Sequence, residues 1–331
     1  MSARTFLRLP ERLRPVSRRQ RGVALITAVL IVALATILAT RIGFDSALEQ
    51  RRSASAMTLD LAFQVGLGAE AWAASFLKED FDNDATPKRD HFAEKWATPI
   101  PPIPIDGGKI EGRLIDLQGR FNVNNLVTPQ RTKNNEAVRQ FRQLLGMLDL
   151  EEKWADVLVD WLDADTQPEP MDGAEDNVYM SQSPPYRSAN GPITSISELM
   201  ALPEFGRERY EKLRPYITAL PIGEPLNVCT APGMVLDSIN DGTIEYGVDP
   251  EALARSREQN CFPTKQDLAT TFNPQMYQQA EAGLGERSNY FALSALVTIG
   301  TTEYSLYSLL YRDPSNGLVR PVMRSFVADQ Q

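Results

Sequence analysis

Arg21-Gly22-Val23-Ala24-Leu25-Ile26-Thr27-Ala28-Val29-Leu30 begins the stretch on which the interpretation of this chain depends. The apolar run continues without a charged residue to Thr40, so that Val23 to Thr40 comprises eighteen uncharged residues. As a helix they would extend about 27 Å, close to the roughly 30 Å hydrocarbon core of a bilayer. The run therefore predicts a membrane anchor, and a buried core helix is the alternative.

The charges are distributed unevenly along the chain. Residues 1–22 hold seven arginines and one glutamate, a net charge of +6, which leaves −15 on residues 23–331 of a protein whose net charge is −9. The basic leader predicts a cytoplasmic amino terminus, because loops rich in Lys and Arg stay on the cytoplasmic side. The acidic body disfavours nucleic-acid binding, which depends mainly on Lys and Arg neutralising phosphates. On these residues alone, an uncleaved signal anchor is the simplest interpretation.

Cysteine and histidine are scarce. Cys229 and Cys261 suit one disulfide in an oxidising compartment, and two buried free thiols are the alternative. His91 is the only histidine in the sequence. A single histidine argues against multi-histidine zinc sites and leaves little room for histidine-based catalytic triads.

The helical pattern continues beyond the apolar run. Apolar residues recur at intervals of three and four from Phe44 to Phe76, and no proline lies between residues 16 and 86. We therefore expect one continuous helix from Val23 to about Leu77. Half of it would lie in the membrane and half would pack on a globular sheet.

Segments with the composition of β-strands lie at both ends of the remaining sequence: 108–117, 121–124, 289–299, 303–311 and 318–327. Two strands cannot form a stable sheet alone, so the early and late segments are expected to pair. The sheet would then be split, with a mostly helical segment of about residues 129–285 inserted between its halves. Before the first strand, residues 80–84 are expected to form a solvated helix exit and residues 99–104 an extended linker.

An acidic segment within the insertion carries the clearest chemical signal. Between Trp154 and Tyr186 there are eight carboxylates and no lysine or arginine. Crowded carboxylates without basic partners repel one another unless a cation neutralises them. Calcium suits such a group because it accepts six to eight oxygen ligands in irregular geometry. A solvated acidic loop is the alternative.

The amino-terminal segment resembles the type IV prepilin signal. A basic leader that ends in Gly22 and continues directly into a hydrophobic helix is typical of that signal. The resemblance implies cleavage after Gly22 by prepilin peptidase and N-methylation of the new first residue, Val23. Thr27 stands where most family members have glutamate. A subunit that lacks this charge has lost a reason to lie beneath another subunit, which indicates the end of a fibre.

The acidic segment and the chain as a whole resemble the K-type minor pseudopilins of bacterial type II secretion systems. The motifs that carry the resemblance are Asp160-Trp-Leu-Asp163-Ala-Asp165, Gly173-Ala-Glu175-Asp176-Asn-Val-Tyr179 and Pro185-Tyr186-Arg187-Ser-Ala-Asn190-Gly191. The resemblance implies one or two calcium ions in the insertion. Its candidate ligands are Asp160, Asp163, Asp165, Glu175, Asp176 and Asn190, with the carbonyl of Tyr179 as a further candidate.

The same resemblance implies an α+β fold in which a long N-terminal transmembrane helix packs on an antiparallel, pilin-like sheet. The insertion would be a SAM-like or helix-hairpin-helix domain. Its short helical units at 198–217 balance acidic and basic residues, which again argues against DNA binding. The implied parts are a leader (1–22), a transmembrane and assembly helix (23–78), a first sheet part (79–128), the insertion (129–285) and a second sheet part (286–331).

The resemblance also implies a structural role and no catalytic residues. The chain would be a single-pass inner-membrane protein with its body in the periplasm, which moves to the pseudopilus tip on assembly and supports export of folded proteins. Its partners would be the I- and J-type minor pseudopilins, the major pseudopilin, prepilin peptidase and the inner-membrane assembly platform. A signal-anchored calcium-binding adaptor and a metal-dependent hydrolase are the alternatives.

The leader gives the first testable prediction. Mass spectrometry of the membrane-extracted protein should show a chain that begins at Val23 and carries one added methyl group. An intact leader would contradict the prepilin interpretation and favour the signal-anchored adaptor.

Overall fold

The computed structural model describes residues 18–83, 88–98 and 101–326, so most of the predicted leader lies outside the described residues. The chain divides into two compact units, one that ends at Leu59 and one that begins at Asp60. Helix α1 (Arg18–Asn83) contributes to both, which confirms the expected long helix and extends it by one to two turns at its carboxyl end.

In the first unit, α1 is long and apolar enough to cross a membrane. Within the described residues it is the only such helix, and its most apolar eighteen-residue window has a mean hydropathy of 2.7 and no buried residue. The hydroxyl of Thr27 donates to the carbonyl oxygens of Val23 and Ala24, at 3.1 and 3.0 Å. A polar group in hydrocarbon must be satisfied internally, and Thr27 meets this requirement within its own helix.

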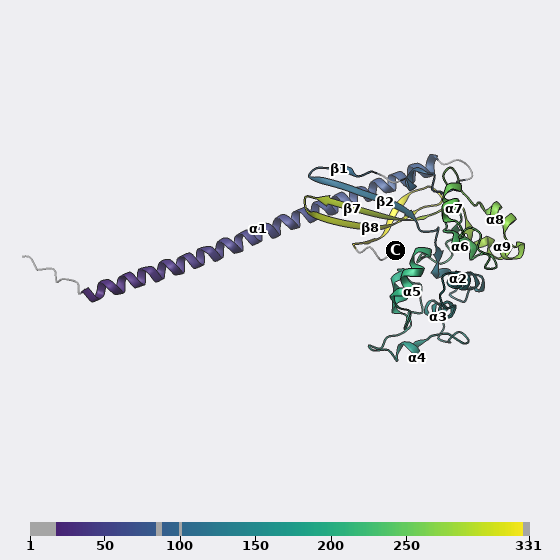
Figure 1. The fold of residues 1–331 in the computed structure, drawn as a ribbon, viewed down its shortest axis with the longest axis horizontal. Helices are drawn as coiled ribbons and strands as arrows, with labels where there is room; N and C mark the ends of the chain where they lie inside the picture. The colour runs from purple at the N-terminus through teal and green to yellow at the C-terminus, as the bar shows by residue number, and fades with distance from the viewer. Residues whose placement is uncertain (1–17, 84–87, 99–100, 327–331) are drawn as a thin grey trace, which may run out of the picture. The chain divides into compact units, whose positions relative to one another are not determined.

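In the second unit, the remainder of α1 packs along a sheet (Figure 1). Ala73 and Leu77 are buried against Phe291, Leu293 and Leu310 of that sheet. Two turns before Ala73, Gly66 allows α1 to approach β8 closely, because an added Cβ at this position would lie 3.4 Å from Leu306. The apolar repeat in the sequence does not coincide with this buried face, because Met57, Leu61 and Trp72 stay exposed whereas the small residues Ala62 and Ala73 are buried.

The sheet is antiparallel and has the strand order β1-β2-β7-β8-β9. Its strands are β1 (Ile103–Ile105), β2 (Gly108–Asp116), β7 (Tyr290–Ile299), β8 (Thr302–Arg312) and β9 (Val319–Ser325). Strand β2 pairs with β7 in a register that places Leu114 opposite Leu293. Strands from the two ends of the sequence are therefore neighbours, which confirms the split sheet. The exact domain boundaries given above stay predictions.

Two segments differ from the sequence-based expectation. The proline-rich linker is partly a strand, since β1 pairs with β2 and places Pro104 opposite Lys109 on the sheet edge, where proline is tolerated. Residues 99 and 100 of that linker lie outside the described residues. The predicted strand 121–124 is short: β3 (Phe121–Asn122) pairs in parallel with β4 (Ile217–Thr218) and not with the large sheet.

Asparagine side chains explain why the chain leaves the strand after β3. The Asn122 side chain accepts hydrogen bonds from the backbone nitrogens of Asn124 and Leu220, at 3.2 and 3.0 Å. The Asn124 amide donates to the carbonyl oxygens of Ile193 and Leu220, at 2.9 and 2.7 Å. The local bond from Asn124 N to the Asn122 side chain competes with a β-ladder, and the chain turns into the 3-10 helix η2 (Val123–Leu126).

The insertion between β2 and β7 is mostly helical, as expected. Its α-helices are α2 (Asn135–Met147), α3 (Lys153–Leu162), α4 (Asp176–Tyr179), α5 (Gly206–Leu213), α6 (Gly233–Asp237), α7 (Pro250–Ser256), α8 (Lys265–Thr271) and α9 (Pro274–Ala280). Short 3-10 helices η3 (Ile196–Ala201), η4 (Arg214–Tyr216) and η5 (Glu281–Gly283) and strands β5 (Leu226–Asn227) and β6 (Leu284–Gly285) complete it. Stacked Phe121 and Phe141 lie in its core. Cys229 and Cys261 form a disulfide, which excludes the alternative of two free thiols.

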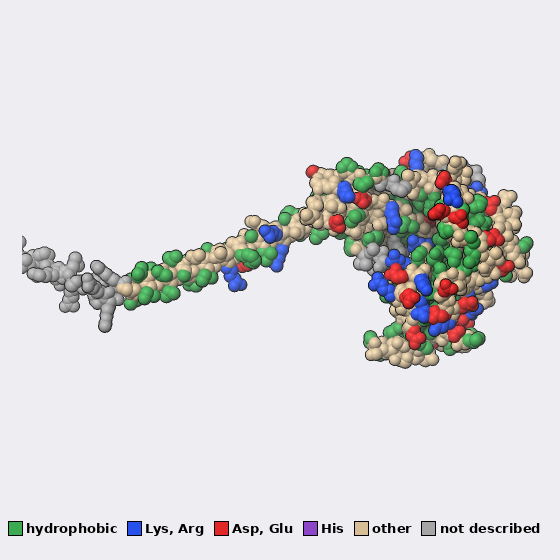
Figure 2. Space-filling view, viewed as in Figure 1, with side chains coloured by type: hydrophobic (Ala, Val, Ile, Leu, Met, Phe, Trp, Pro, Cys, Tyr) green, Lys and Arg blue, Asp and Glu red, His purple; other side chains and the backbone are tan. Residues whose placement is uncertain are grey.

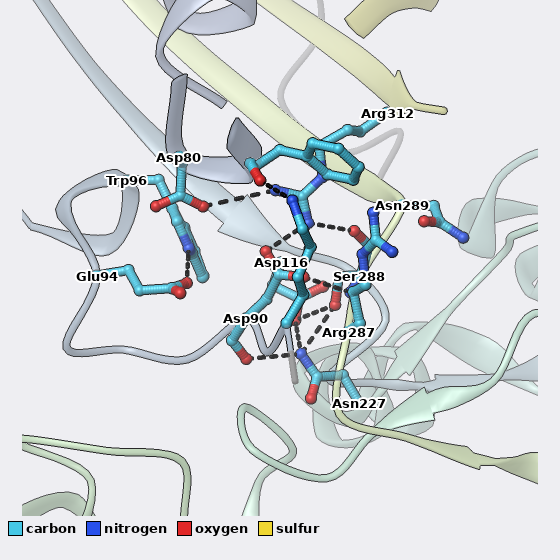
Figure 3. A network of polar contacts seen from close by, with 12 residues as sticks. Asp80, Asp90, Glu94, Trp96, Asp116, Asn227, Arg287, Ser288, Asn289 and Arg312 are labelled. Atoms are coloured by element: carbon cyan, nitrogen blue, oxygen red, sulfur yellow. Dashed lines mark hydrogen bonds and ion pairs between the residues drawn. The ribbon is translucent and has the colours of Figure 1, made fainter. Parts of the chain in front are cut away.

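A buried polar network joins the sheet to the insertion (Figure 3). The guanidinium of Arg312, at the end of β8, is paired with Asp90 and donates to the carbonyl oxygen of Ser288 at 2.7 Å. The Asn227 amide, from β5, donates to the backbone oxygen of Asp90 and to Ser288 Oγ, both at 2.9 Å, and to Asp116 Oδ2 at 3.0 Å. Five separate stretches of sequence meet in this network.

The same network corrects the expected solvated helix exit. The side chain of Asp80 is mostly buried and lies 3.5 Å from Arg312 Nη1. Asp82 is more exposed and pairs with Lys78 one turn before it on α1. Asp84 lies outside the described residues. The acidic pattern therefore ends the helix with one carboxylate in the interior and one on the surface.

A buried carboxylate on α1 ties the helix to the far strands of the sheet. Glu70 accepts hydrogen bonds from Arg324 Nε and Nη2, at 2.8 and 2.7 Å, and from Ser308 Oγ at 2.6 Å. Burial opposes ionisation of Glu70, but the hydrogen bonds from Arg324 and Ser308 and the charge of Arg324 lower the pKa of the carboxyl below 4.5.

Replacing Glu70 should test this contact. Glu70→Gln should lower the free energy of unfolding at neutral pH by about 1–3 kcal/mol, the usual cost of losing hydrogen bonds to a charged group. Because the folded-state pKa is lowered, the stabilisation is present above pH 4.5 and is lost as the pH falls through the folded-state value. Urea unfolding of the detergent-solubilised protein should therefore show a difference that shrinks toward acid pH. Glu79→Gln, on an exposed face of the same helix, is the matched control.

Candidate metal centre

The acidic segment begins on α3 and continues through a loop to α4. The apolar side of α3, with Trp154, Leu158 and Leu162, is buried in the core of the insertion. Asp163 is the C-cap residue of this helix, so that the chain turns out of it directly at the first clustered carboxylate. Residues 164–175 then form the loop that leads to α4.

Three of the predicted ligands come together. Asp163, Asp165 and Glu175 each place one carboxylate oxygen within 4.8 Å of the others. Asp163 and Glu175 are buried, with 5% and 4% of their surface exposed, whereas Asp165 is exposed. Asp163 Oδ1 and both side-chain oxygens of Glu175 have no hydrogen-bond partner among the described residues. A buried carboxylate without a partner is costly, so these oxygens are suited to a cation.

The electrostatic state of the cluster agrees with this interpretation. Burial, followed by the charge of Asp165, raises the pKa of Asp163 to about 6. Burial, followed by the charges of Asp163 and Asp165, raises the pKa of Glu175 to about 7. Without a counter-charge, the cluster thus favours proton uptake. A divalent cation would remove this tendency by stabilising the ionised carboxylates.

Asn190 lies next to the cluster. Its amide nitrogen donates to the backbone oxygen of Asp165 at 2.7 Å, and its Oδ1 is buried without a hydrogen-bond partner. Arg131 supports the same region, since its Nη2 donates to the carbonyl oxygens of Asp163, at 2.9 Å, and of Asn190. The Oδ1 atom of Asn190 is therefore available as a fourth oxygen ligand for a hard cation.

Asp160 has a different geometry. Both of its carboxylate oxygens accept hydrogen bonds from Glu169 N, at 3.0 and 3.2 Å, and Oδ2 also accepts from Ala174 N at 2.6 Å. Gly173 makes this approach possible, because an added Cβ there would lie 2.4 Å from Asp160 Oδ2. The carboxylate of Asp160 therefore holds the backbone of the loop 164–175, and both of its oxygens already accept hydrogen bonds.

The remaining two candidates are also engaged elsewhere. Asp176 Oδ1 accepts from the backbone nitrogen of Ser188 at 3.0 Å, and Oδ2 lies 3.8 Å from Arg187 Nε. The carbonyl oxygen of Tyr179 accepts from the backbone nitrogens of Gln182 and Tyr186, at 3.2 and 3.4 Å. The predicted ligand set thus divides into a central group, Asp163, Asp165, Glu175 and Asn190, and a surrounding group that shapes the loops.

Basic partners for part of the acidic segment were missed by the sequence analysis. Lys133 pairs with Glu169 at 2.5 Å and with Asp156 at 3.2 Å, and Arg142 forms two hydrogen bonds of 2.7 Å to Asp156. Both cations lie outside the window 154–186, on or just before α2, so only the tertiary structure brings them to it. The statement that the whole segment lacks basic partners is therefore wrong. For the central group, none of the described ion pairs involves Asp163, Asp165 or Glu175, and the neighbouring Arg131 donates its Nη2 to backbone oxygens.

A second acidic cluster provides a contrast. Asp80, Asp90 and Glu94 also place one oxygen each within 4.8 Å of one another. There, however, Arg312 already pairs with Asp90 and lies 3.5 Å from Asp80. The protein supplies its own cation at this cluster. Of the two clusters, the one around Glu175 therefore fits an oxygen-ligated ion better, and the absence of histidine or cysteine from it suits calcium rather than zinc.

Comparisons with known proteins agree on one family. The family model described as type II secretion system protein K matches residues 119–222, which include the candidate metal centre. The type II secretion system protein K of Pseudomonas aeruginosa is 36% identical over 318 residues, covering 93% of each chain. That of Aeromonas hydrophila is 30% identical over 328 residues, covering 92% of this chain and 97% of the relative.

A solved structure extends the likeness to most of the fold. A chain in the crystal structure of the GspK-GspI-GspJ complex from the type 2 secretion system of enterotoxigenic Escherichia coli superposes with a TM-score of 0.73. The two chains are 25% identical, and the match covers 84% of this chain and 99% of the other.

Proposed function

The chain belongs to the type II secretion system protein K family and is a minor pseudopilin, and we propose that it forms the pseudopilus tip together with I- and J-type partners. The observation that carries this proposal is the superposition on a chain of the GspK-GspI-GspJ complex over 99% of that chain. In this role the protein helps to initiate pseudopilus assembly and supports export of folded proteins from the periplasm. Its part is structural and not catalytic.

The amino-terminal helix supports a membrane-anchored precursor. Its apolar part suits a single-pass anchor in the inner membrane, with the body that begins near Asp60 in the periplasm. Prepilin peptidase would cleave between Gly22 and Val23 and allow methylation of Val23. The inner-membrane assembly platform and the major pseudopilin would then receive the mature helix.

Thr27 supports a terminal position in the fibre. Its hydroxyl bonds to carbonyl oxygens of its own helix and carries no charge. It therefore does not require a neighbouring amino terminus above it, as a buried carboxylate would. The insertion between β2 and β7 is a large body to accommodate within a thin fibre, which also favours the end of the pseudopilus.

We further propose that one calcium ion binds Asp163, Asp165 and Glu175, with Asn190 as an additional oxygen donor. The buried oxygens without hydrogen-bond partners support this assignment. The ion would neutralise the carboxylates and join the end of α3 to the start of α4, so its effect is to order the loop. A second ion stays a prediction.

The assembly proposal is tested by co-expression. An affinity-tagged form of this chain, expressed with the I- and J-type pseudopilins of the same organism, should copurify with both from detergent extracts. Tagged J-type pseudopilin with I-type alone is the control for complexes that do not need this chain. Recovery of the I–J pair with no binding of this chain would contradict the proposal.

The calcium proposal is tested by thermal unfolding after removal of divalent ions. About 1 mM calcium should raise the Tm of the wild-type protein by several degrees, because a ligand that binds only the folded state stabilises it. Asp163→Asn should abolish this rise, and Asp172→Asn, at an exposed position of the same loop, should preserve it. Asp160→Asn should lower the Tm even without calcium, since Asp160 bonds to the loop backbone. An unchanged wild-type Tm would show that the cluster is only an acidic loop.

A further inference from the structure

A cleft of about 360 Å³ lies between the sheet and the insertion, on the sheet face opposite α1. Its floor comes from strands β2, β7 and β8 and includes Ile115 and Tyr307, and its rim includes Arg113, Arg120 and Arg214. Figure 2 shows Lys and Arg side chains near the place where the insertion around α5 meets the sheet. This cleft is separate from the candidate metal centre, with which it shares no lining residue.

The three arginines place like charges around one cleft. Within residues 18–83, 88–98 and 101–326, neither Arg113 nor Arg120 forms an ion pair or a side-chain hydrogen bond. Arg214 lies 3.8 Å from Glu211 Oε2, and both of these side chains are partly exposed. In a protein with a net charge of −9, two arginines without an ion pair among the described residues, beside a third that is paired, form an unusual local feature.

The setting of Arg120 indicates that an anion would be favourable. Arg120 is partly buried, directly after Gly119, whose added Cβ would lie 2.7 Å from Thr230 Oγ1. Burial, followed by the charges of Arg214 and Arg113, lowers the pKa of Arg120, although the charge of Asp116 acts in the opposite direction. An anionic group in the cleft would offset the repulsion among these arginines. A planar guanidinium is well suited to binding a carboxylate through two hydrogen bonds.

The floor of the cleft narrows the choice of anion. Ile115 of β2 and Tyr307 of β8 are partly exposed and present apolar surface between the arginines, and the buried side chains of Leu117 and Ala292 complete the lining. A segment that combines carboxylates with an apolar side chain can use both the rim and the floor. A small inorganic anion would leave the floor without a partner, and a nucleic-acid duplex would meet the repulsion of an acidic protein.

We propose that this cleft binds an acidic segment of a partner protein, with carboxylates on the arginine rim and an apolar side chain on the sheet floor. Charge complementarity of this kind gives specificity and fast association more than raw affinity. The proposal rests only on the cleft, and it holds whether or not the metal centre binds calcium.

The test uses the full-length protein in a nonionic detergent and a short fluorescein-labelled peptide in which glutamates alternate with leucines. Fluorescence anisotropy at low salt should show binding, and a peptide with glutamine in place of glutamate should bind at least about tenfold more weakly. The double variant Arg113→Gln/Arg120→Gln should weaken binding of the acidic peptide by a similar factor. Arg207→Gln, at an exposed position on α5 outside the cleft, is the matched control and should bind as the wild type does.

A charge exchange keeps the test independent of folding. Arg113 is exposed, so the Arg113→Glu variant should fold. This variant should no longer bind the acidic peptide and should bind a peptide in which lysines alternate with leucines. Equal binding of the glutamate and glutamine peptides, or unchanged binding by the double variant, would overturn the proposal. So would tighter binding of inorganic phosphate or of phosphatidylserine vesicles than of the peptide, with the same dependence on the arginines. Copurification with the I- and J-type pseudopilins is measured separately and does not depend on this outcome.

Discussion

The guanidinium of Arg312 is almost completely removed from water, and the arrangement of the sheet domain depends on how its charge is satisfied. Only 2% of this side chain is exposed. Asp90 pairs with it, Asp80 lies 3.5 Å away, and the ring of Phe291 lies 4.9 Å from it. A buried charge is strongly destabilising when it loses its partner. The end of α1, the loop after it and the end of β8 must therefore keep their relative positions.

Hydrogen bonds of neutral and acidic side chains connect this buried ion pair to the insertion. Asp116, at the end of β2, accepts hydrogen bonds from Thr230 and from Ser288, and Asn227 joins it to Asp90. Burial raises the pKa of Asp116 to about 6 despite these bonds. The connection between sheet and insertion is thus made by polar groups whose partners are specific, and such contacts orient one body on another more precisely than apolar packing does. This orientation also shapes the arginine cleft, which lies between the same two bodies.

The two acidic clusters show how the chain manages negative charge. Around Arg312 the cation is part of the protein, and the carboxylates are held by a side chain from a distant strand. Around Glu175 a neighbouring cation, Arg131, uses its Nη2 on backbone oxygens, and Asp163 Oδ1 and both Glu175 oxygens have no hydrogen-bond partner among the described residues. The first arrangement stabilises the fold without a ligand. Under the calcium proposal, the second makes the order of the loop depend on a bound cation.

The sequence by itself determined the elements with strong periodicity. The apolar run after Gly22, the long helix without proline and the late strands follow from local patterns, because helix and strand periods are properties of neighbouring residues. The acidic segment, which contains Asp163, Asp165 and Glu175, was also recognisable from the sequence. Family resemblance then supplied the function, since the motifs are specific to one class of secretion protein.

Only the tertiary structure decided which charges meet. Nothing local distinguishes Asp160, whose oxygens hold a backbone loop, from Asp163, whose Oδ1 has no partner. Lys133 and Arg142 reach the acidic segment from α2 and its approach, and Arg113 and Arg214 meet across the junction of sheet and insertion. Electrostatic interactions act through space and depend on distance and burial, whereas sequence patterns report only what neighbours along the chain can do. For that reason the partners of the charged groups, unlike the helices and strands, became visible only in the folded chain.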